Sequence, residues 1–446
     1  MKAYERPIIK KIIEGIPNKF GATKRLNAIT EIDGIPVSTL IKDYGSPVFV
    51  VSEKTIRETY HEAYTAFSTR YPKVQFAWSY KTNYLDSVCR VFHSEGSWAE
   101  VVSGFEYQKA INNGVPGNKI IFNGPDKTKE DLQRAIDNQS LIHIDHFDEL
   151  LNIIELAKTS EKKPQVAIRI NMDTGIFPQW DRFGFNYDNG EAWKTISRIM
   201  MDDNLELVGL HCHIGTYMMT PAPYAVAAGK MATLAKRIDE KWQHAIRYID
   251  MGGGFASKNT LKGAYLPGTD TCPTFDQYAE AITGALISAN FDNDKLPALF
   301  LETGRALIDD AGYLLGTVLA NKRLADGRRT TILDAGVNIL FTSFWYEHEI
   351  YPAKETSFQT EETTLYGPLC MNIDVIRQNI NFPLLKKGDH FVIKRVGAYN
   401  MTQWMQFITL RPKIVMIDTK GNAHIIRENE DNQMFSKLEQ IPNHLK

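Results

Sequence analysis

Short apolar stretches that end in polar or glycine-rich residues recur along the first two thirds of the chain. There are eight, at 74–81, 97–103, 119–124, 141–146, 165–171, 206–215, 247–254 and 298–305. Several of the segments between them have helical periodicity, as in KEDLQRAIDN (129–138) and FDELLNIIELAK (147–158). Continuous apolar strands alternating with helices are typical of a parallel sheet covered on both faces. Eight such units predict an α/β fold of the TIM-like (β/α)8 barrel type.

Polar or reactive residues stand at the C-terminal ends of these strands. They are Lys81, Ser103, Asn123, His146, Arg169, His213, Gly252–Gly254 and Glu302. In a barrel these ends meet at one mouth, where active sites are built. The alternative is an open doubly wound sheet, which would spread the same residues along an edge.

The pattern changes after Arg305. Stretches such as GYLLGTVLANKR (312–323) and DHFVIKRVGAY (389–399) predict strands joined by short turns, hence a second, all-β domain. A helix at 38–45 and a strand at 47–52 stand outside the count of eight. We expect residues 1–45 to contribute to the β domain, 46–308 to form the barrel and 309–446 to form the C-terminal β domain.

Composition indicates a small-molecule partner. The 51 basic and 53 acidic side chains are interspersed, so nothing points to nucleic acid or to a membrane surface. The first residues, MKAYERPIIKKIIEG, are too charged for a signal peptide, and no later run has transmembrane length. Cys89, Cys212, Cys272 and Cys370 form no CxxC pair, which predicts reduced thiols and a cytoplasmic protein.

Two features predict an amine beside an anion-binding loop. Lys81 ends an apolar, aromatic strand, so it is either a surface residue or a desolvated amine able to form an imine. Gly252, Gly253 and Gly254 form either a tight turn or a phosphate cradle, in which backbone N–H groups approach an anion.

Two further features have more than one interpretation. His211 and His213 point the same way from a strand and are core histidines, zinc ligands or, for His213, a stacking partner for a planar cofactor. Glu302 and Arg305 either neutralise each other or divide between a pyridinium N–H and a phosphate or carboxylate. An amine, an aromatic stacker, a phosphate cradle and an acid for a ring nitrogen together indicate pyridoxal 5'-phosphate.

The sequence resembles the fold-type III decarboxylases, which include the diaminopimelate, ornithine and arginine decarboxylases, and is nearest to the diaminopimelate branch. The resemblance covers about residues 36 to 410. It rests on WSYKTN (78–83), EVVSGFE (100–106), HCHIGT (211–216), DMGGGF (250–255), LETGR (301–305), LDAGVN (333–338), GPLCMNID (367–374) and GAYN (397–400).

The resemblance implies a role for each matching position and implies no metal. Lys81 would form a Schiff base with the cofactor, His213 would stack on its ring, and Glu302 would pair with the ring nitrogen. Cys370 would reach the partner subunit's barrel as a proton donor, so that the C-terminal β domain completes the active site of a homodimer. Near the cofactor or its phosphate would lie Glu100, Thr216, Gly252, Gly253, Gly254, Arg305 and Tyr399.

Two departures concern the distal end of the substrate. The family's glutamate after the cysteine is Met371 here, and its arginine after the DAGMN-like motif is replaced near Thr342. Burial of an uncompensated charge is costly. We therefore expect a modified or conjugated amino acid rather than meso-diaminopimelate, ornithine or lysine. Further substrate-binding candidates are Trp180 and Asp181, with Asp374 or Glu347 as a possible anion.

Three alternatives remain open at this point. The chain is a true meso-diaminopimelate decarboxylase, a same-fold racemase or epimerase, or a non-catalytic cofactor-binding relative. Glu302 argues against the racemase, because the alanine racemases that resemble this barrel use an arginine opposite the ring nitrogen. A zinc hydrolase built on His211 and His213 would require a stoichiometric metal.

Overall fold

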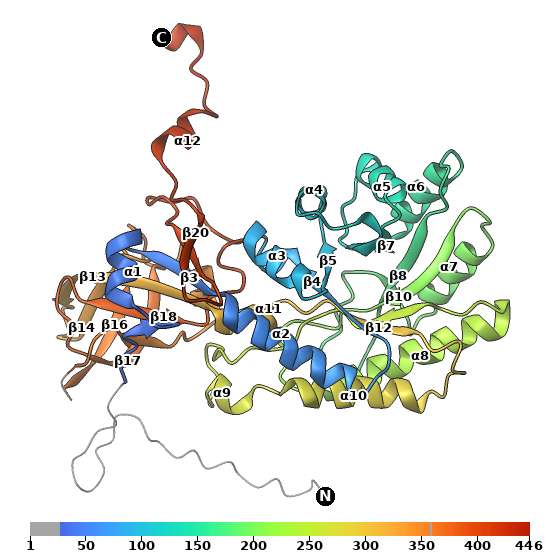
Figure 1. Ribbon diagram of the computed structural model, residues 1–446, viewed down its shortest axis with the longest axis horizontal. Helices are drawn as coiled ribbons and strands as arrows, with labels where there is room; N and C mark the ends of the chain where they lie inside the picture. The colour runs from blue at the N-terminus through green and yellow to red at the C-terminus, as the bar shows by residue number, and fades with distance from the viewer. Residues whose placement is uncertain (1–26, 357–358) are drawn as a thin grey trace, which may run out of the picture.

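The computed structural model describes residues 27–356 and 359–446 and contains two parts, a barrel and a second β-sheet region (Figure 1). The first residues, MKAYERPIIKKIIEG, which are expected to be too charged for a signal peptide, lie outside these ranges. Within them, no helix combines the length and the apolar character needed to cross a membrane. All four cysteines are free thiols.

The barrel consists of the eight parallel strands that the sequence predicts. It closes because β12 pairs with β4 and β10 pairs with β8. This closure excludes the open doubly wound sheet. The strands are β4 (Val74–Ser79), β5 (Trp98–Val101), β6 (Ile120–Phe122), β7 (Leu141–Ile144), β8 (Gln165–Asn171), β10 (Glu206–His211), β11 (Tyr248–Asp250) and β12 (Ala298–Leu301).

Helices surround these strands, and α2, α4, α5, α6 and α10 each begin at a residue whose side chain accepts a hydrogen bond from the backbone of the first turn. In α10, the Thr274 side chain accepts a hydrogen bond from the backbone N–H of Gln277, and the Gln277 side chain accepts one from the backbone N–H of Thr274. This capping box satisfies two N–H groups. The helices of the barrel are α2 (Glu53–Ser68), α3 (Asp86–Ser94), α4 (Gly104–Asn112), α5 (Lys129–Asp137), α6 (Phe147–Ala157), α7 (Glu191–Met200), α8 (Ala222–Trp242), α9 (Gly268–Thr271), α10 (Phe275–Ser288) and α11 (Arg305–Ile308).

The barrel interior is filled with side chains rather than open. A buried cluster with one or more members from most strands occupies it: Ala77, Ile121, Leu141, Ala167, Val208, Tyr248 and Phe300. This packing closes the lower part of the barrel. Polar side chains at the strand ends therefore gather at the mouth above a solid floor.

The second sheet has the strand order β17-β16-β14-β13-β3-β19-β20, with β18 pairing with β13 and β15. Its strand β3 (Val48–Ser52) pairs with β13 and β19, although these residues fall inside the range expected for the barrel. The predicted three-part division otherwise stays a prediction. The other strands are β13 (Gly312–Arg323), β14 (Arg329–Leu333), β15 (Ile350–Pro352), β16 (Thr360–Tyr366), β17 (Val375–Pro383), β18 (His390–Lys394), β19 (Ile414–Ile417) and β20 (Ala423–Arg427).

Short elements complete the chain. The helix α1 packs its apolar face on β3, because Val37, Leu40 and Ile41 share a buried cluster with Val48 and Val50. The remaining elements are β1 (Glu31–Ile32), β2 (Ile35–Pro36), α1 (Val37–Tyr44), β9 (Phe185–Asn186), α12 (Asn432–Ser436) and the 3-10 turns η1 (Tyr80–Thr82), η2 (Gly117–Lys119), η3 (Asp309–Ala311), η4 (Phe341–Phe344) and η5 (Asn443–Leu445).

Candidate active site

Lys81 lies at the mouth of the barrel, in the turn η1 that follows β4. Its Nζ is 2.5 Å from Oε2 of Glu100, which is fully buried on the neighbouring strand β5. The lysine side chain is itself 39% exposed and so faces the open mouth. Burial lowers the pKa of the Lys81 amine, but the carboxylates of Glu100 and Glu302 outweigh burial and raise it. The amine is therefore charged and must give up a proton before it reacts as a nucleophile, with Glu100 beside it to accept that proton.

Glu302 ends the strand β12 and is joined to Glu100 through one amide. Asn123 Nδ2 donates to Oε1 of Glu302 at 2.6 Å and to Oε1 of Glu100 at 3.0 Å. Asp250 lies next to Glu302. Burial and the like charge of Glu302 raise the pKa of the Asp250 carboxyl well above its usual range. Asp250 also accepts from the backbone N–H of Gly252 at 2.8 Å. These contacts bring the ends of four strands together around one carboxylate.

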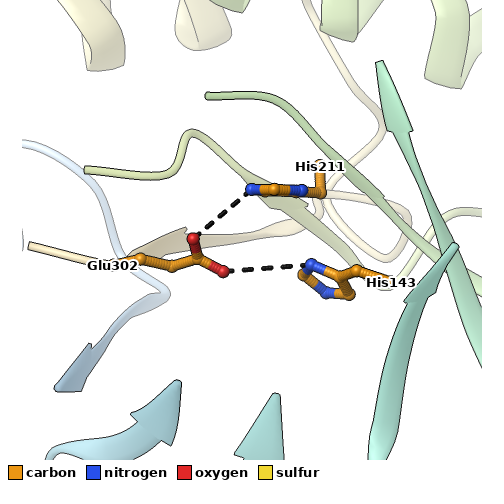
Figure 2. A group of neighbouring side chains, drawn as sticks. All are labelled: His143, His211 and Glu302. Atoms are coloured by element: carbon orange, nitrogen blue, oxygen red, sulfur yellow. Dashed lines mark ion pairs between the residues drawn. The ribbon is translucent and has the colours of Figure 1, made fainter. Parts of the chain in front are cut away.

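Two buried histidines face Glu302 from other strands (Figure 2). His211 Nε2 is 3.4 Å from Oε2, and His143 Nδ1 is 3.9 Å from Oε1. Desolvation is the first cause that lowers the pKa of both rings well below their ordinary value, with nearby positive charge adding to it. Both imidazoles are therefore neutral at neutral pH.

His213 lies apart from this pair, although the sequence suggested it beside His211 as a zinc ligand. Its Nδ1 accepts from the backbone N–H of Gly253 at 3.2 Å, and its ring lies 5.5 Å from that of Trp180. Burial, and then the charge of Arg169, lower the pKa of His213 to about 3. Because its Nδ1 is engaged by the glycine loop and its ring lies beside that of Trp180, His213 fits a stacking role better than metal binding. In the described residues, the cluster with metal-ligand spacing consists of His143, His211 and Glu302 instead.

The three glycines after β11 permit close backbone approach. A Cβ at Gly253 would come within 2.4 Å of the carbonyl oxygen of Glu302, and one at Gly254 within 2.2 Å of that of Gly215. Gly252 and Gly254 also have positive φ values of 65° and 91°. Side chains are therefore excluded here on two grounds, as in a loop that admits a phosphate group.

Arg305 is almost completely buried in a cage of aromatic rings. Its guanidinium carbon lies 4.5 Å from the centre of the Tyr399 ring and 5.3 Å from that of Tyr217. The rings of Trp345 and Tyr346 also contact it, and Tyr346 accepts a hydrogen bond from Nη1. Tyr399 is held in turn, because its backbone N–H donates to the carbonyl of Thr82 at 2.8 Å. No carboxylate of the described residues forms a salt bridge with Arg305, so it is available to an anionic ligand.

The predicted substrate-binding residues are scattered. Thr342 is fully buried and its Oγ1 contacts His348 Nε2 at 2.8 Å and Asn400 Oδ1 at 3.0 Å. Asp374 is also buried and accepts from the backbone N–H groups of Val337 and Leu369. Both are therefore engaged inside the protein. Trp180 lies against His213, and the backbone N–H of Asp374 donates to the carbonyl of Met371 at 3.1 Å. Asp181, Thr216 and Cys370 are exposed, and Met371 is half-buried.

Four residues shape the site in addition to those predicted from the sequence: Asn123, His143, Tyr217 and Tyr346. Asn123 was noted only as a strand-end residue, and its position is the signal that could have identified it. His143 follows the alternation of LIHID, in which it shares a face with Asp145. No sequence signal distinguishes the two tyrosines from routine buried ones.

The arrangement fits pyridoxal 5'-phosphate on observations of this structure alone. Lys81 offers an amine to an aldehyde, the glycine loop leaves room for a phosphate, and His213 presents a neutral ring. Glu302 supplies a buried negative charge for a protonated ring nitrogen.

Comparison with known proteins agrees with this geometry. Residues 54–309 match the family model described as "Pyridoxal-dependent decarboxylase, pyridoxal binding domain". The chain is 30% identical to the diaminopimelate decarboxylase of Methanocaldococcus jannaschii, covering 93% of this chain and 95% of that protein. It is 27% identical to the diaminopimelate decarboxylase of Bacillus subtilis, covering 92% and 94%. The crystal structure of the M. jannaschii enzyme superposes with a TM-score of 0.86 at 29% identity, covering 93% of this chain and 97% of that one.

Proposed function

This chain belongs to the pyridoxal-dependent decarboxylases, and from that premise we propose that its substrate is an amino acid with a neutral, acylated or conjugated distal end. As a member of this family it is an enzyme that uses pyridoxal 5'-phosphate to remove the carboxyl group of an amino acid. The proposal concerns which amino acid that is.

The internal engagement of Thr342 carries the proposal. This residue stands near where diaminopimelate decarboxylases place an arginine, and its hydroxyl is occupied by His348 and Asn400. Met371 stands in place of the family's glutamate and offers no charge. A substrate with a free distal amine and carboxylate would therefore find neither a glutamate for the amine nor an arginine for the carboxylate. An uncompensated buried charge costs several kcal/mol, on the order of 3–5.

Other acids near these positions are already engaged. Asp374 accepts two backbone hydrogen bonds, and Glu347 forms an ion pair with Arg377 at 3.1 Å. Asp181 is exposed in the loop between β8 and β9. Three uncharged side chains at these positions, those of Phe344, Trp345 and Met371, are also partly exposed. These surroundings suit an uncharged distal group better than an ammonium group.

The chain's own residues perform recognisable tasks in decarboxylation. When bound, the cofactor supplies an electron sink for the bond that breaks at Cα. Lys81 would hold the cofactor covalently and yield to the substrate amine, and Glu100 would accept the proton that the lysine releases. Glu302 would keep the ring nitrogen protonated, and His213 would offer a flat neutral face to the ring. Arg305 attracts a carboxylate or phosphate into its aromatic cage.

Protonation at Cα is assigned to Cys370 of the partner subunit. Cys370 is exposed on the second part of the chain, and its neighbour Ile373 is 55% exposed. At the rim of the barrel mouth, Phe105 is 59% and Trp180 38% exposed. Two exposed apolar surfaces, one beside the thiol and one beside the mouth, support a homodimer with shared active sites.

The test is carbon dioxide release by purified, cofactor-loaded enzyme with a panel of amino acids, with Lys81→Ala as the inactive control. The panel contains meso-diaminopimelate, both enantiomers of lysine and ornithine, and Nε-acylated or otherwise conjugated derivatives. We expect turnover of a neutral or conjugated member and little of meso-diaminopimelate. Fast turnover of meso-diaminopimelate would overturn the proposal and favour the second candidate, the activity for which the relatives are named. Exchange of the Cα proton without carbon dioxide release would favour a racemase.

A further inference from the structure

Glu302 is a buried carboxylate without a cation of its own. Three positive side chains around the barrel mouth have another carboxylate partner: Lys81 pairs with Glu100 at 2.5 Å, Arg169 with Asp145 at 3.7 Å, and Lys127 with Glu149 at 2.7 Å. Arg305 lies in its aromatic cage instead. Among the described residues, no lysine or arginine forms a salt bridge with Glu302. A buried charge requires compensation, which the protonated ring of the cofactor supplies only while it is bound.

The atoms that face Glu302 from the histidines are ligand atoms. His143 Nδ1 and His211 Nε2 are buried, lie 3.9 and 3.4 Å from the carboxylate oxygens, and have no hydrogen-bond partner in the part of the chain that the structure describes. Figure 2 shows both rings directed at the one carboxylate from different strands. The candidate ligand atoms of all three residues lie within 4.8 Å of one another.

A further contact prepares His143 to bind a metal. Its Nε2 lies 2.9 Å from the hydroxyl of Tyr248, so in the tautomer whose Nε2–H donates to Tyr248 the Nδ1 lone pair faces Glu302. The tyrosine reaches this position because it packs over Gly209, where a Cβ would come within 2.2 Å of its ring. Such an outer hydrogen bond, which fixes the tautomer of a ligating histidine, is usual in metal sites.

We propose that His143, His211 and Glu302 form a divalent-metal site on the floor of the cofactor pocket, occupied by Zn²⁺ when the cofactor is absent. Two imidazoles and one carboxylate with an open fourth position are a common zinc ligand set. Small side-chain shifts bring these atoms to the Zn–N and Zn–O distances of about 2.0–2.2 Å. Because Glu302 also compensates the ring nitrogen, metal and cofactor exclude each other. The inference does not depend on which amino acid is the substrate.

The competing occupant is a proton. Burial and the charge of Glu302 raise the pKa of the Asp250 carboxyl, so a proton on Asp250 beside Glu302 would also relieve the buried charge. A metal ion differs from a proton in two measurable respects, since it requires the histidines and gives a spectroscopic signal with Co²⁺.

The experiment uses the full-length chain stripped of cofactor. We expect calorimetry to show one Zn²⁺ per chain, and Co²⁺ to give the visible absorption of a four-coordinate site. Saturation with pyridoxal 5'-phosphate should abolish both signals, and Zn²⁺ should in turn slow cofactor binding. His143→Asn should remove the site, and Tyr248→Phe should weaken Zn²⁺ binding by about 10–100-fold.

His61→Asn is the matched control, because His61 is an exposed histidine on α2 far along the chain from these strands. It should bind Zn²⁺ as the wild type does. Circular dichroism checks that His143→Asn is folded, and Tyr248→Phe gives an independent test if it is not. Binding that survives in His143→Asn would assign the metal to a thiol such as Cys370 and overturn the proposal. Absence of Co²⁺ absorption, or simultaneous binding of metal and cofactor, would also overturn it.

Discussion

Asp309 accepts a hydrogen bond at 3.1 Å from the backbone N–H of Ala398, the residue that precedes Tyr399. The other oxygen of this buried carboxyl accepts from Ser257 at 2.5 Å and from Asn259 at 3.0 Å, on the segment that continues from the glycine loop. One side chain therefore ties together the two segments that flank the predicted phosphate position. It also lies close enough to Arg305 for the guanidinium to affect its pKa.

Asp309 predicts a pH dependence of stability. Burial raises its pKa to about 6, although Arg305 and the hydrogen bonds oppose this. Because the folded pKa lies above the unfolded value of about 3.9, folding favours the protonated form. The contribution is present below about pH 4 and is lost as the pH rises through about 6, a change of roughly 3 kcal/mol.

The measurement is the melting temperature (Tm) of Asp309→Asn and wild type between about pH 4.5 and about pH 7.5. The asparagine cannot ionise, so we expect its Tm relative to that of the wild type to rise with pH. Asp203→Asn, at an exposed position, is the control and should show a constant difference. A constant difference for Asp309→Asn as well would contradict this assignment of the buried carboxyl.

Substitution of Thr342 should lower the stability of the protein without changing its substrate specificity. Thr342→Val deletes a hydroxyl that contacts His348 and Asn400. His348 Nε2 loses this partner, whereas Asn400 Oδ1 keeps the backbone N–H of Thr342. We expect a loss of about 1–3 kcal/mol of stability, measured by denaturation. The ranking of kcat/KM across the substrate panel should not change, because the hydroxyl does not face the substrate. Thr342→Ser keeps the hydroxyl and should restore most of the stability; a reordered substrate ranking in Thr342→Val would place the residue at the distal group.

Glu100 predicts how cofactor attachment depends on pH. Its carboxylate helps to raise the pKa of the Lys81 amine, and only the uncharged amine attacks an aldehyde. In Glu100→Gln this pKa falls, so the uncharged amine becomes available at lower pH. We expect the pH profile of cofactor attachment to the stripped enzyme, followed by visible absorbance, to move to lower pH. Glu100→Asp retains the charge and should move the pH profile less. An unchanged profile in Glu100→Gln would show that Glu100 does not control the pKa of the Lys81 amine.

The barrel could be predicted because its signals are local and repeated. Each strand is a continuous apolar run followed by a polar end, and its order along the chain determines its neighbour in the barrel. For the same reason Lys81 and Glu302 could be brought together from their strand positions, whereas Glu100 was expected near the cofactor only from the family resemblance. The role of β3 was harder to place, because the strand precedes the barrel in sequence but pairs with β13 and β19 far along the chain.

The substrate-binding residues could not be predicted in the same way. Thr342 and Asp374 lie in loops, where side-chain direction follows from tertiary contacts and not from strand alternation. Sequence position places Thr342 near the substrate's distal end, yet its partner Asn400 lies 58 residues away and turns the hydroxyl inward. The position of His143 in the site could not be predicted, because an imidazole within an apolar strand is indistinguishable in sequence from a hydrogen-bonded core residue.

The proposed sharing of active sites between two subunits predicts that two inactive variants restore each other. Lys81→Ala lacks the cofactor amine, and Cys370→Ala lacks the proton donor, so each homodimer is inactive in every site. In a mixed dimer, the barrel that keeps Lys81 receives Cys370 of the partner subunit and is complete, while the other barrel lacks both groups. Random mixing in equal amounts makes half the dimers mixed, so about a quarter of the wild-type activity should return.

Subunit exchange is measured by mixing the two variants, dissociating them mildly and following carbon dioxide release after reassembly. The control mixes Lys81→Ala with Glu302→Gln. Because both changes lie in the same barrel, a mixed dimer then contains one barrel without the lysine and one without the acid, and no activity should return. No recovery in the first mixture would show that Cys370 acts within its own chain, and an active Cys370→Ala homodimer would show that Cys370 is not the proton donor. Since Cys370 is exposed and the mouth presents Phe105 and Trp180, recovery only in the first mixture is the expected result.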